Sequence, residues 1–134
     1  MNLAAERAAP RIKSIFWDAI KKMTFSDARQ ILKGPDDAAA QYFRKKISTQ
    51  LQGEIKPVVN QAMSEVGVIQ IYRSLDRKIR ALPFTKTLSF DLDQYVTDKA
   101  LDGLFSMLTA EEKKIRQDPA ARVTDLLKKV FAKL

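Results

Sequence analysis

Hydrophobic residues recur every three or four positions along most of the chain, the spacing of helices with one buried face. A stripe of this kind runs from Ile12 to Met23, and the clearest one runs from Val123 to Leu134. The alternation of apolar and polar residues that is typical of a strand never persists beyond four residues. The pattern therefore predicts an all-α fold.

Helix-ending residues divide this pattern into segments. Thr24 and Asp27 have the spacing of a capping box, and Gly34 is expected to end the helix that follows in a left-handed conformation. Ser48 or Thr49 is expected to cap a later helix, and Pro57 inside that helix predicts a kink or a fresh start. Gly67 is a further expected stop. We expect a compact single-domain bundle of about six to eight helices spanning residues 1–134.

Two further features complete this picture. Pro10 is expected to start or kink the first long helix, and Leu82–Phe90 is the one extended loop that the pattern predicts. No apolar run approaches the roughly 20 residues that a transmembrane helix requires, so none is predicted.

Composition restricts the chemistry that the protein can perform. The 134 residues include neither cysteine nor histidine. Catalytic triads that need histidine, cysteine nucleophiles and ordinary zinc sites are therefore excluded. We accordingly expect a protein that is not an enzyme, and we predict no cofactor.

Positive charge is concentrated in the middle of the chain. The formal net charge is +8, and residues 67–90 carry five basic groups against one acidic group. Arg73, Arg77 and Arg80 share one face of a predicted helix, and Lys78 lies beside them in sequence. These four residues are the candidate basic face for phosphates or anionic lipid, although an ordinary solvated surface would have the same pattern.

Three tyrosines, Tyr42, Tyr72 and Tyr95, are candidates for lining a pocket. Aromatic residues on helical stripes more commonly pack in the core and direct only the hydroxyl to the surface, so this alternative stays open. Trp17 lies off the stripe of its own helix and is expected to be exposed or packed against a second element.

Carboxylates supply the remaining candidate chemistry. Asp91, Asp93, Asp98 and Asp102 are weak candidates for metal ligands or for an acid–base pair. The glycine and the distant glutamate of a calcium loop are missing, and helix capping and ion pairing also account for these aspartates. No metal site is predicted from them.

Several long strings of residues match a known family in order and wording. Among them are Ala28-Arg-Gln-Ile-Leu-Lys-Gly-Pro-Asp-Asp-Ala38, Asp93-Gln-Tyr-Val-Thr97, Lys99-Ala-Leu-Asp-Gly-Leu-Phe105 and Glu112-Lys-Lys-Ile-Arg-Gln-Asp-Pro-Ala-Ala-Arg122. Through these strings the chain resembles, over nearly its whole length, the bacterial family catalogued as domain of unknown function 4197.

The resemblance implies an exported, periplasmic protein whose precursor carries a signal peptide and an extra N-terminal stretch. This chain has neither, so we expect it to be a trimmed form. The family brings no assigned activity and no catalytic residues. A periplasmic location disfavours genomic DNA as a partner and favours anionic lipid, an envelope polymer or an acidic protein.

The leading hypothesis is a non-catalytic binding or interaction module of the bacterial envelope that recognises an anionic or apolar partner. One alternative is a carboxylate- or metal-dependent enzyme that uses the four aspartates. A second alternative is a helical domain that binds nucleic acid through the basic face; it is less favoured, because the chain has no helix-turn-helix spacing and no aromatic platform for RNA.

Overall fold

The computed structural model describes residues 2–82, 91–122 and 124–132. The elements within these ranges are all helical, which confirms the predicted all-α class. They are α1 (Asn2–Lys21), α2 (Phe25–Lys33), α3 (Ala38–Glu65), α4 (Val68–Arg80), α5 (Leu92–Gln117), the 3-10 helix η1 (Pro119–Ala121) and α6 (Asp125–Phe131).

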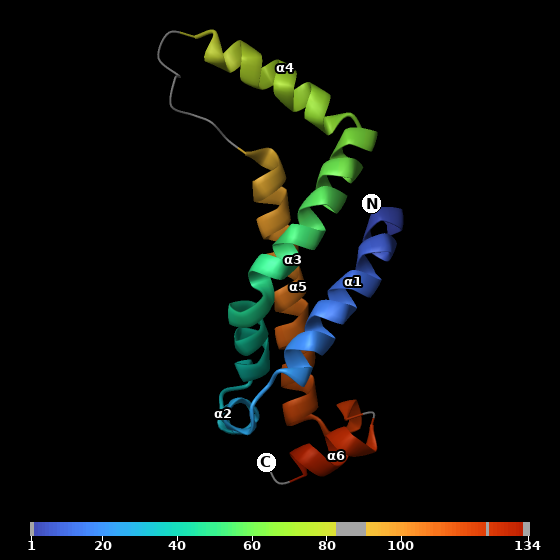
Figure 1. Ribbon diagram of the computed structural model, residues 1–134, viewed down its shortest axis with the longest axis vertical. Helices are drawn as coiled ribbons and strands as arrows, with labels where there is room; N and C mark the ends of the chain where they lie inside the picture. Colours follow the sequence, from blue (N-terminus) through green and yellow to red (C-terminus); the bar gives the residue numbers. More distant parts are fainter. Residues whose placement is uncertain (1, 83–90, 123, 133–134) are drawn as a thin grey trace.

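Three long helices form the body of the molecule. Helix α3 packs against both α1 and α5, and these two helices run antiparallel to it (Figure 1). Every fourth residue of α3 is buried from Phe43 to Ile55, so one continuous face of the helix packs inward. The buried cluster comprises Phe43, Ile47, Leu51, Ile55, Leu101 and Phe105.

The number of helices is slightly lower than expected. The described residues contain five helices of nine residues or more, together with the seven-residue α6 and the short η1. The sequence predicts a new helix at Ser48 or Thr49, whereas α3 passes through both positions without a break. The hydroxyl of Ser48 donates a hydrogen bond to the Arg44 carbonyl one turn earlier, so it is satisfied inside the helix and caps nothing.

Of the two outcomes expected at Pro57, a kink or a fresh start, the fresh start is wrong. Helix α3 continues past this residue, and α1 continues past Pro10. Pro57 has no N–H to offer the Gly53 carbonyl one turn earlier, but both residues are exposed, so water can bond to that carbonyl. Helix α3 bends along its length (Figure 1), as expected of a helix with an interior proline.

The turns between helices show two different uses of glycine. The expected capping box is confirmed at the start of α2, where Thr24 and Asp27 bond to each other's backbone N–H. Gly34 ends α2 with a φ of −79°, in extended rather than left-handed backbone, which corrects the prediction. A Cβ at Gly34 would lie 2.7 Å from the Cβ of Ala38, so a close approach requires this glycine. Gly67, with a φ of 72°, is left-handed and separates α3 from α4.

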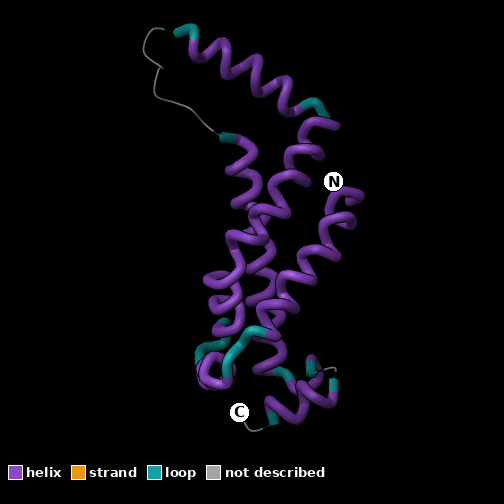
Figure 2. Tube along the Cα trace, in the orientation of Figure 1, coloured by secondary structure: helices purple, strands orange, loops and turns teal. Residues whose placement is uncertain are grey.

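Helix α4 makes the molecule elongated rather than compact. After Gly67 the chain turns away from the axis of the body, and α4 projects from one end (Figures 1 and 2). Helix α4 contacts the rest of the described structure mainly through α3. The expected loop at 82–90 falls, from residue 83 onward, outside the described residues.

Candidate interaction surface on helix α4

Helix α4 exposes large apolar side chains to solvent. Val68, Ile71 and Leu75 are 39%, 69% and 53% exposed; Ile79 extends the same line along the helix, and the exposed Leu82 follows just beyond its end. At 3.6 residues per turn, the four helical positions lie within about 80° around the axis, so together with Leu82 they form one row. We call this row the apolar stripe.

A side of α4 about 90° around the helix axis from the stripe is distinguished by partial burial. Ile69, Tyr72 and Asp76 of α4 are only partly exposed, and they mark the side of the helix that turns toward the rest of the protein. At 100° per residue, Asp76 lies about 100° from Leu75 and about 140° from Ile71 around the helix axis. Ile71 and Leu75 therefore point away from the partly buried side, and their exposed fractions agree with this.

The predicted basic residues of α4 fall on two faces. Arg73, Arg77 and Arg80 lie within about 60° of one another around the helix axis, and we call them the arginine face. Lys78 is seven residues from Ile71 and so stands almost directly above it, beside the apolar stripe. The structure thus groups the three arginines as predicted but places Lys78 apart from them.

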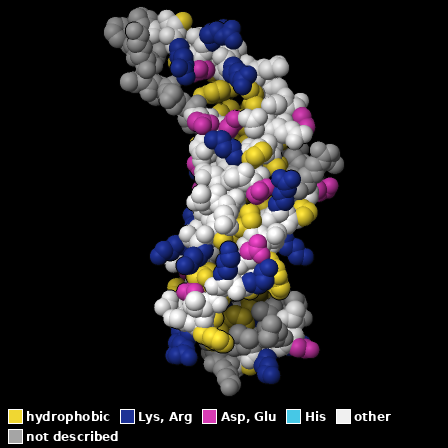
Figure 3. Space-filling model, in the orientation of Figure 1, with side chains coloured by type: hydrophobic (Ala, Val, Ile, Leu, Met, Phe, Trp, Pro, Cys, Tyr) yellow, Lys and Arg dark blue, Asp and Glu magenta, His cyan; other side chains and the backbone are white. Residues whose placement is uncertain are grey.

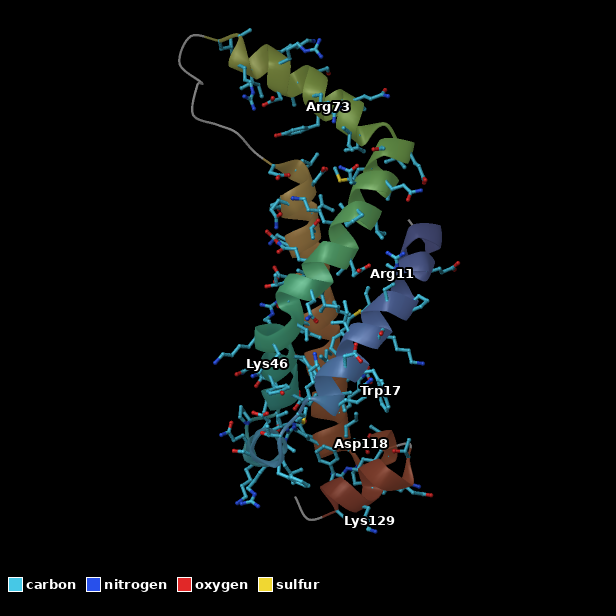
Figure 4. All side chains as sticks on the ribbon, in the orientation of Figure 1. Arg11, Trp17, Lys46, Arg73, Asp118 and Lys129 are labelled. Atoms are coloured by element: carbon cyan, nitrogen blue, oxygen red, sulfur yellow. The ribbon has the colours of Figure 1, made fainter. Side chains whose placement is uncertain are left out.

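Two of the three side chains of the arginine face have no ion pair with another described residue. Arg80 is paired with Asp76 across one helical turn at 2.7 Å. Arg73 and Arg77 are exposed, and among the described residues neither has a carboxylate within ion-pair distance. Figure 3 shows Lys and Arg side chains on α4 next to hydrophobic ones, and Figure 4 labels Arg73 along this helix.

The apolar stripe and the arginine face point in nearly opposite directions. Arg77 lies about 160° around the helix from Leu75, and about 180° from Val68. A flat partner that covers one of these surfaces therefore leaves the other exposed.

The three candidate tyrosines lie on three different helices. Tyr42 of α3 packs edge-on against Phe43 and beside Lys46, and desolvation together with the negative charge of Asp27 raises the pKa of its hydroxyl. Tyr72 belongs to α4, and Tyr95 of α5 is half-exposed beside the Lys99 ammonium. Tyr42 lines two pockets among the described residues, and neither pocket includes Tyr72 or Tyr95. The three tyrosines therefore share neither of these pockets.

Two of the four candidate aspartates have structural partners that are charged. Asp91 is the N-cap of α5, and the Gln94 backbone N–H that it accepts at 2.9 Å lowers its pKa, with help from Lys56. Asp102 pairs with the guanidinium of Arg44 at 2.6 Å. Asp91 thus caps the first turn of α5, and Asp102 joins α5 to α3.

The other two aspartates are bonded to amide side chains. Asp93 accepts from Asn60, and Asp98 accepts from Gln52 at 3.0 Å and from Gln94 at 2.9 Å. Within the described ranges, no three or more acidic, cysteine or histidine residues are grouped so that they could hold a metal ion. The acidic residues of α5 therefore act as a polar seam against α3.

A buried ion pair is the main feature that the sequence leaves unexplained. The carboxylate of Glu112 accepts the backbone N–H groups of Ala39 and Ala40, both at 2.9 Å, and pairs with Arg116 at 2.8 Å. Arg116 also donates to the backbone carbonyls of Ile31 and Leu32.

This pair joins three helices at one end of the body. Glu112 of α5 accepts the backbone N–H groups at the start of α3, where the N-cap Asp37 makes no side-chain cap bond. Arg116 donates to the backbone carbonyls at the end of α2. The sequence shows only an i,i+4 pair of opposite charge, because nothing in it reveals which distant backbone groups the pair will meet. We interpret the pair as structural.

One apolar groove lies away from α4. It has a volume of about 440 Å³ and lies between α1, α3 and α5, with Ile12, Val59 and Leu104 in its walls and Lys13 at its edge. Trp17, which is 60% exposed, lies further along α1 outside this groove. No charged group other than Lys13 is found among the described residues of the lining.

The fold and this surface define a class of protein: an elongated all-helical domain with a projecting, basic amphipathic helix. The chain belongs to the family described as "Protein of unknown function (DUF4197)", and the match covers residues 1–132. No curated protein matches the chain, and no solved structure does. None of the described helices has the length and apolar character needed to cross a membrane.

Proposed function

We propose that this protein is a non-catalytic binding module of the bacterial envelope and that α4 is its docking surface. The proposed partner is anionic, and the apolar stripe adds affinity where that partner also presents apolar surface. The observation that carries this proposal is the pairing, on one projecting helix, of an exposed apolar stripe with arginines that have no carboxylate partner among the described residues.

Exposure of this kind is costly unless it serves an interaction. Ile71 and Leu75 are each more than half exposed, although they lie on the same helix as half-buried residues that the protein does cover. Contiguous apolar surface bordered by polar residues is typical of binding sites in soluble proteins. The same stripe in a helix that only served the core would face the bundle.

The geometry gives less support to the two alternatives. A nucleic acid would contact the arginine face and would leave the apolar stripe in water. An enzyme built on Asp91, Asp93, Asp98 and Asp102 would need carboxylates free to bind a metal or move a proton, whereas protein donors engage all four.

The proposal is tested by titrating the full chain with two anionic probes, soluble dextran sulfate and phosphatidylglycerol vesicles. We expect at least one probe to bind, with an affinity that falls as salt rises. The double variant Arg73→Gln/Arg77→Gln should bind on the order of tenfold more weakly. The control Lys45→Gln/Lys113→Gln removes the same charge from the body and should bind almost normally.

Two results would overturn the proposal. One is the absence of binding to either probe at low salt. The other is an equal loss of affinity in the two charge variants, because this would mean that net charge alone, rather than α4, attracts the probe.

A further inference from the structure

We infer that α4 is an interfacial anchor that lies in the headgroup layer of an anionic lipid bilayer. This inference rests on the proposed function and names its partner. The helix is expected to lie parallel to the bilayer surface, with Ile71 and Leu75 directed into the acyl region and the arginine face directed outward.

The opposed faces of α4 favour a bilayer over a soluble partner. A flat acidic protein or polymer can cover the apolar stripe or the arginine face, but not both, because about 160° of helix separates Leu75 from Arg77. A bilayer surrounds the helix instead. Amphipathic helices sink about 5–10 Å into the boundary between headgroups and acyl chains, and a helix is about 10–12 Å across. The far face then still lies at the level of the headgroups.

Charge complementarity specifies which bilayer is favoured. Arg73 and Arg77 have no carboxylate partner among the described residues, and Lys78 stands beside the stripe, where its ammonium can reach a phosphate while its stem follows the apolar surface. Each basic residue near an anionic surface strengthens binding, and a zwitterionic surface offers no such attraction. The partner is therefore a bilayer that contains anionic lipid.

The position of α4 in the molecule permits this arrangement without unfolding. Helix α4 lies at one end of the elongated molecule, and α2 and α6 lie at the other (Figure 1). The buried cluster of α3 and α5 contains no residue of α4. The stripe can enter a bilayer while the core of the body stays intact.

The first experiment measures sedimentation of the full chain with vesicles. We expect binding to equimolar phosphatidylglycerol and phosphatidylcholine to exceed binding to phosphatidylcholine alone by at least about tenfold. Ile71→Ser/Leu75→Ser should weaken binding to the anionic vesicles by a similar factor. The control Phe25→Ser/Met107→Ser also removes two exposed apolar side chains, which are 96% and 71% exposed, but on α2 and α5. It should bind normally.

A second experiment tests the orientation of the helix. Trp17→Phe removes the one tryptophan of the chain, and a new tryptophan is then placed at position 75 or position 70. Gln70 lies about 140° around the helix from Leu75. With anionic vesicles, Leu75→Trp should shift its fluorescence strongly to the blue, whereas Gln70→Trp should shift little.

The outcomes separate this inference from the proposed function. Binding to dextran sulfate without binding to anionic vesicles would overturn the bilayer inference and leave the proposed function standing. Failure with both probes would overturn both. Equal fluorescence shifts at the two tryptophan positions, or normal vesicle binding by Ile71→Ser/Leu75→Ser, would overturn the proposed orientation and with it the inference.

Discussion

Glu112 illustrates how a single side chain can hold several helices together. Its carboxylate is buried, accepts two backbone N–H groups of α3 and pairs with Arg116. Buried charges are tolerated only when such partners replace the water that they lose. The end of the body formed by α2, α3 and α5 therefore depends on one carboxylate.

Glu112→Gln should destabilise the protein strongly. An amide presents N–H groups to donors that need an acceptor, and it leaves Arg116 without its counter-charge. Breaking a buried pair in this way costs about 3–5 kcal/mol, measured as the free energy of unfolding in urea. Glu111→Gln, at the neighbouring exposed position where Lys114 is 2.7 Å away, should cost less than about 1 kcal/mol. Similar losses in the two variants would contradict the structural role of Glu112.

Two glycines should respond in opposite ways to alanine. At Gly34 a Cβ would lie 2.7 Å from the Ala38 Cβ and 2.8 Å from the Gln30 carbonyl oxygen, so Gly34→Ala should destabilise by about 1–3 kcal/mol. At Gly53, inside α3, no atom lies within 4 Å, and Gly53→Ala should stabilise by about 0.5–1 kcal/mol. Thermal unfolding of both variants measures the difference, and a neutral Gly34→Ala would show that the turn can relax.

At the scale of the elements, the capping box of α2 links stability to pH. The Thr24 hydroxyl and backbone N–H hold the pKa of Asp27 below its ordinary value of 3.8. A carboxyl whose pKa is lower in the folded state stabilises the fold above its ordinary pKa, and this contribution is lost as pH falls through the folded pKa. Asp27→Asn should therefore be less stable than the wild type at pH 7, and the gap should close in acid.

The measurement is urea unfolding of the two proteins at pH 7 and at about pH 3. A gap that is unchanged or wider in acid would contradict the assigned bond. Thr24→Ala, which removes the other half of the box, should cost about 1 kcal/mol at neutral pH.

Pro57 gives a second prediction for an element. Pro57→Ala restores one backbone bond to the Gly53 carbonyl within the continuous helix α3, and alanine is the better helix former. We expect a gain of about 1–3 kcal/mol in the free energy of unfolding, reduced somewhat because proline also restricts the unfolded chain. A loss of stability would show that the bend at this position is needed for packing.

Local signals were sufficient for some elements and insufficient for others. The box at Thr24 and Asp27 and the stop at Gly67 were predictable, because their partners lie within a few residues. The passage of α3 through Ser48 and Pro57 was not, because the packing of one face against α1 and α5 outweighs a local cost. The conformation of Gly34 is likewise set by its approach to Ala38.

At the scale of the whole molecule, the sequence identifies the amphipathic character of α4 but not its exposure. A stripe at Val68, Ile71 and Leu75 ordinarily predicts a buried face. Whether the bundle covers that face depends on the direction of the chain after Gly67, which no local pattern specifies. The exposure of the stripe could therefore be recognised only from the fold, whereas the grouping of Arg73, Arg77 and Arg80 follows from the helical period alone.

Amide hydrogen exchange of the full chain, with and without phosphatidylglycerol vesicles, tests most directly whether α4 is the docking surface. In solution, α4 amides should exchange faster than the amides around Leu51 in the core, because few tertiary contacts hold α4. With vesicles, new protection should be confined to residues 68–82. Protection that appears on the body while α4 remains unchanged would contradict the account.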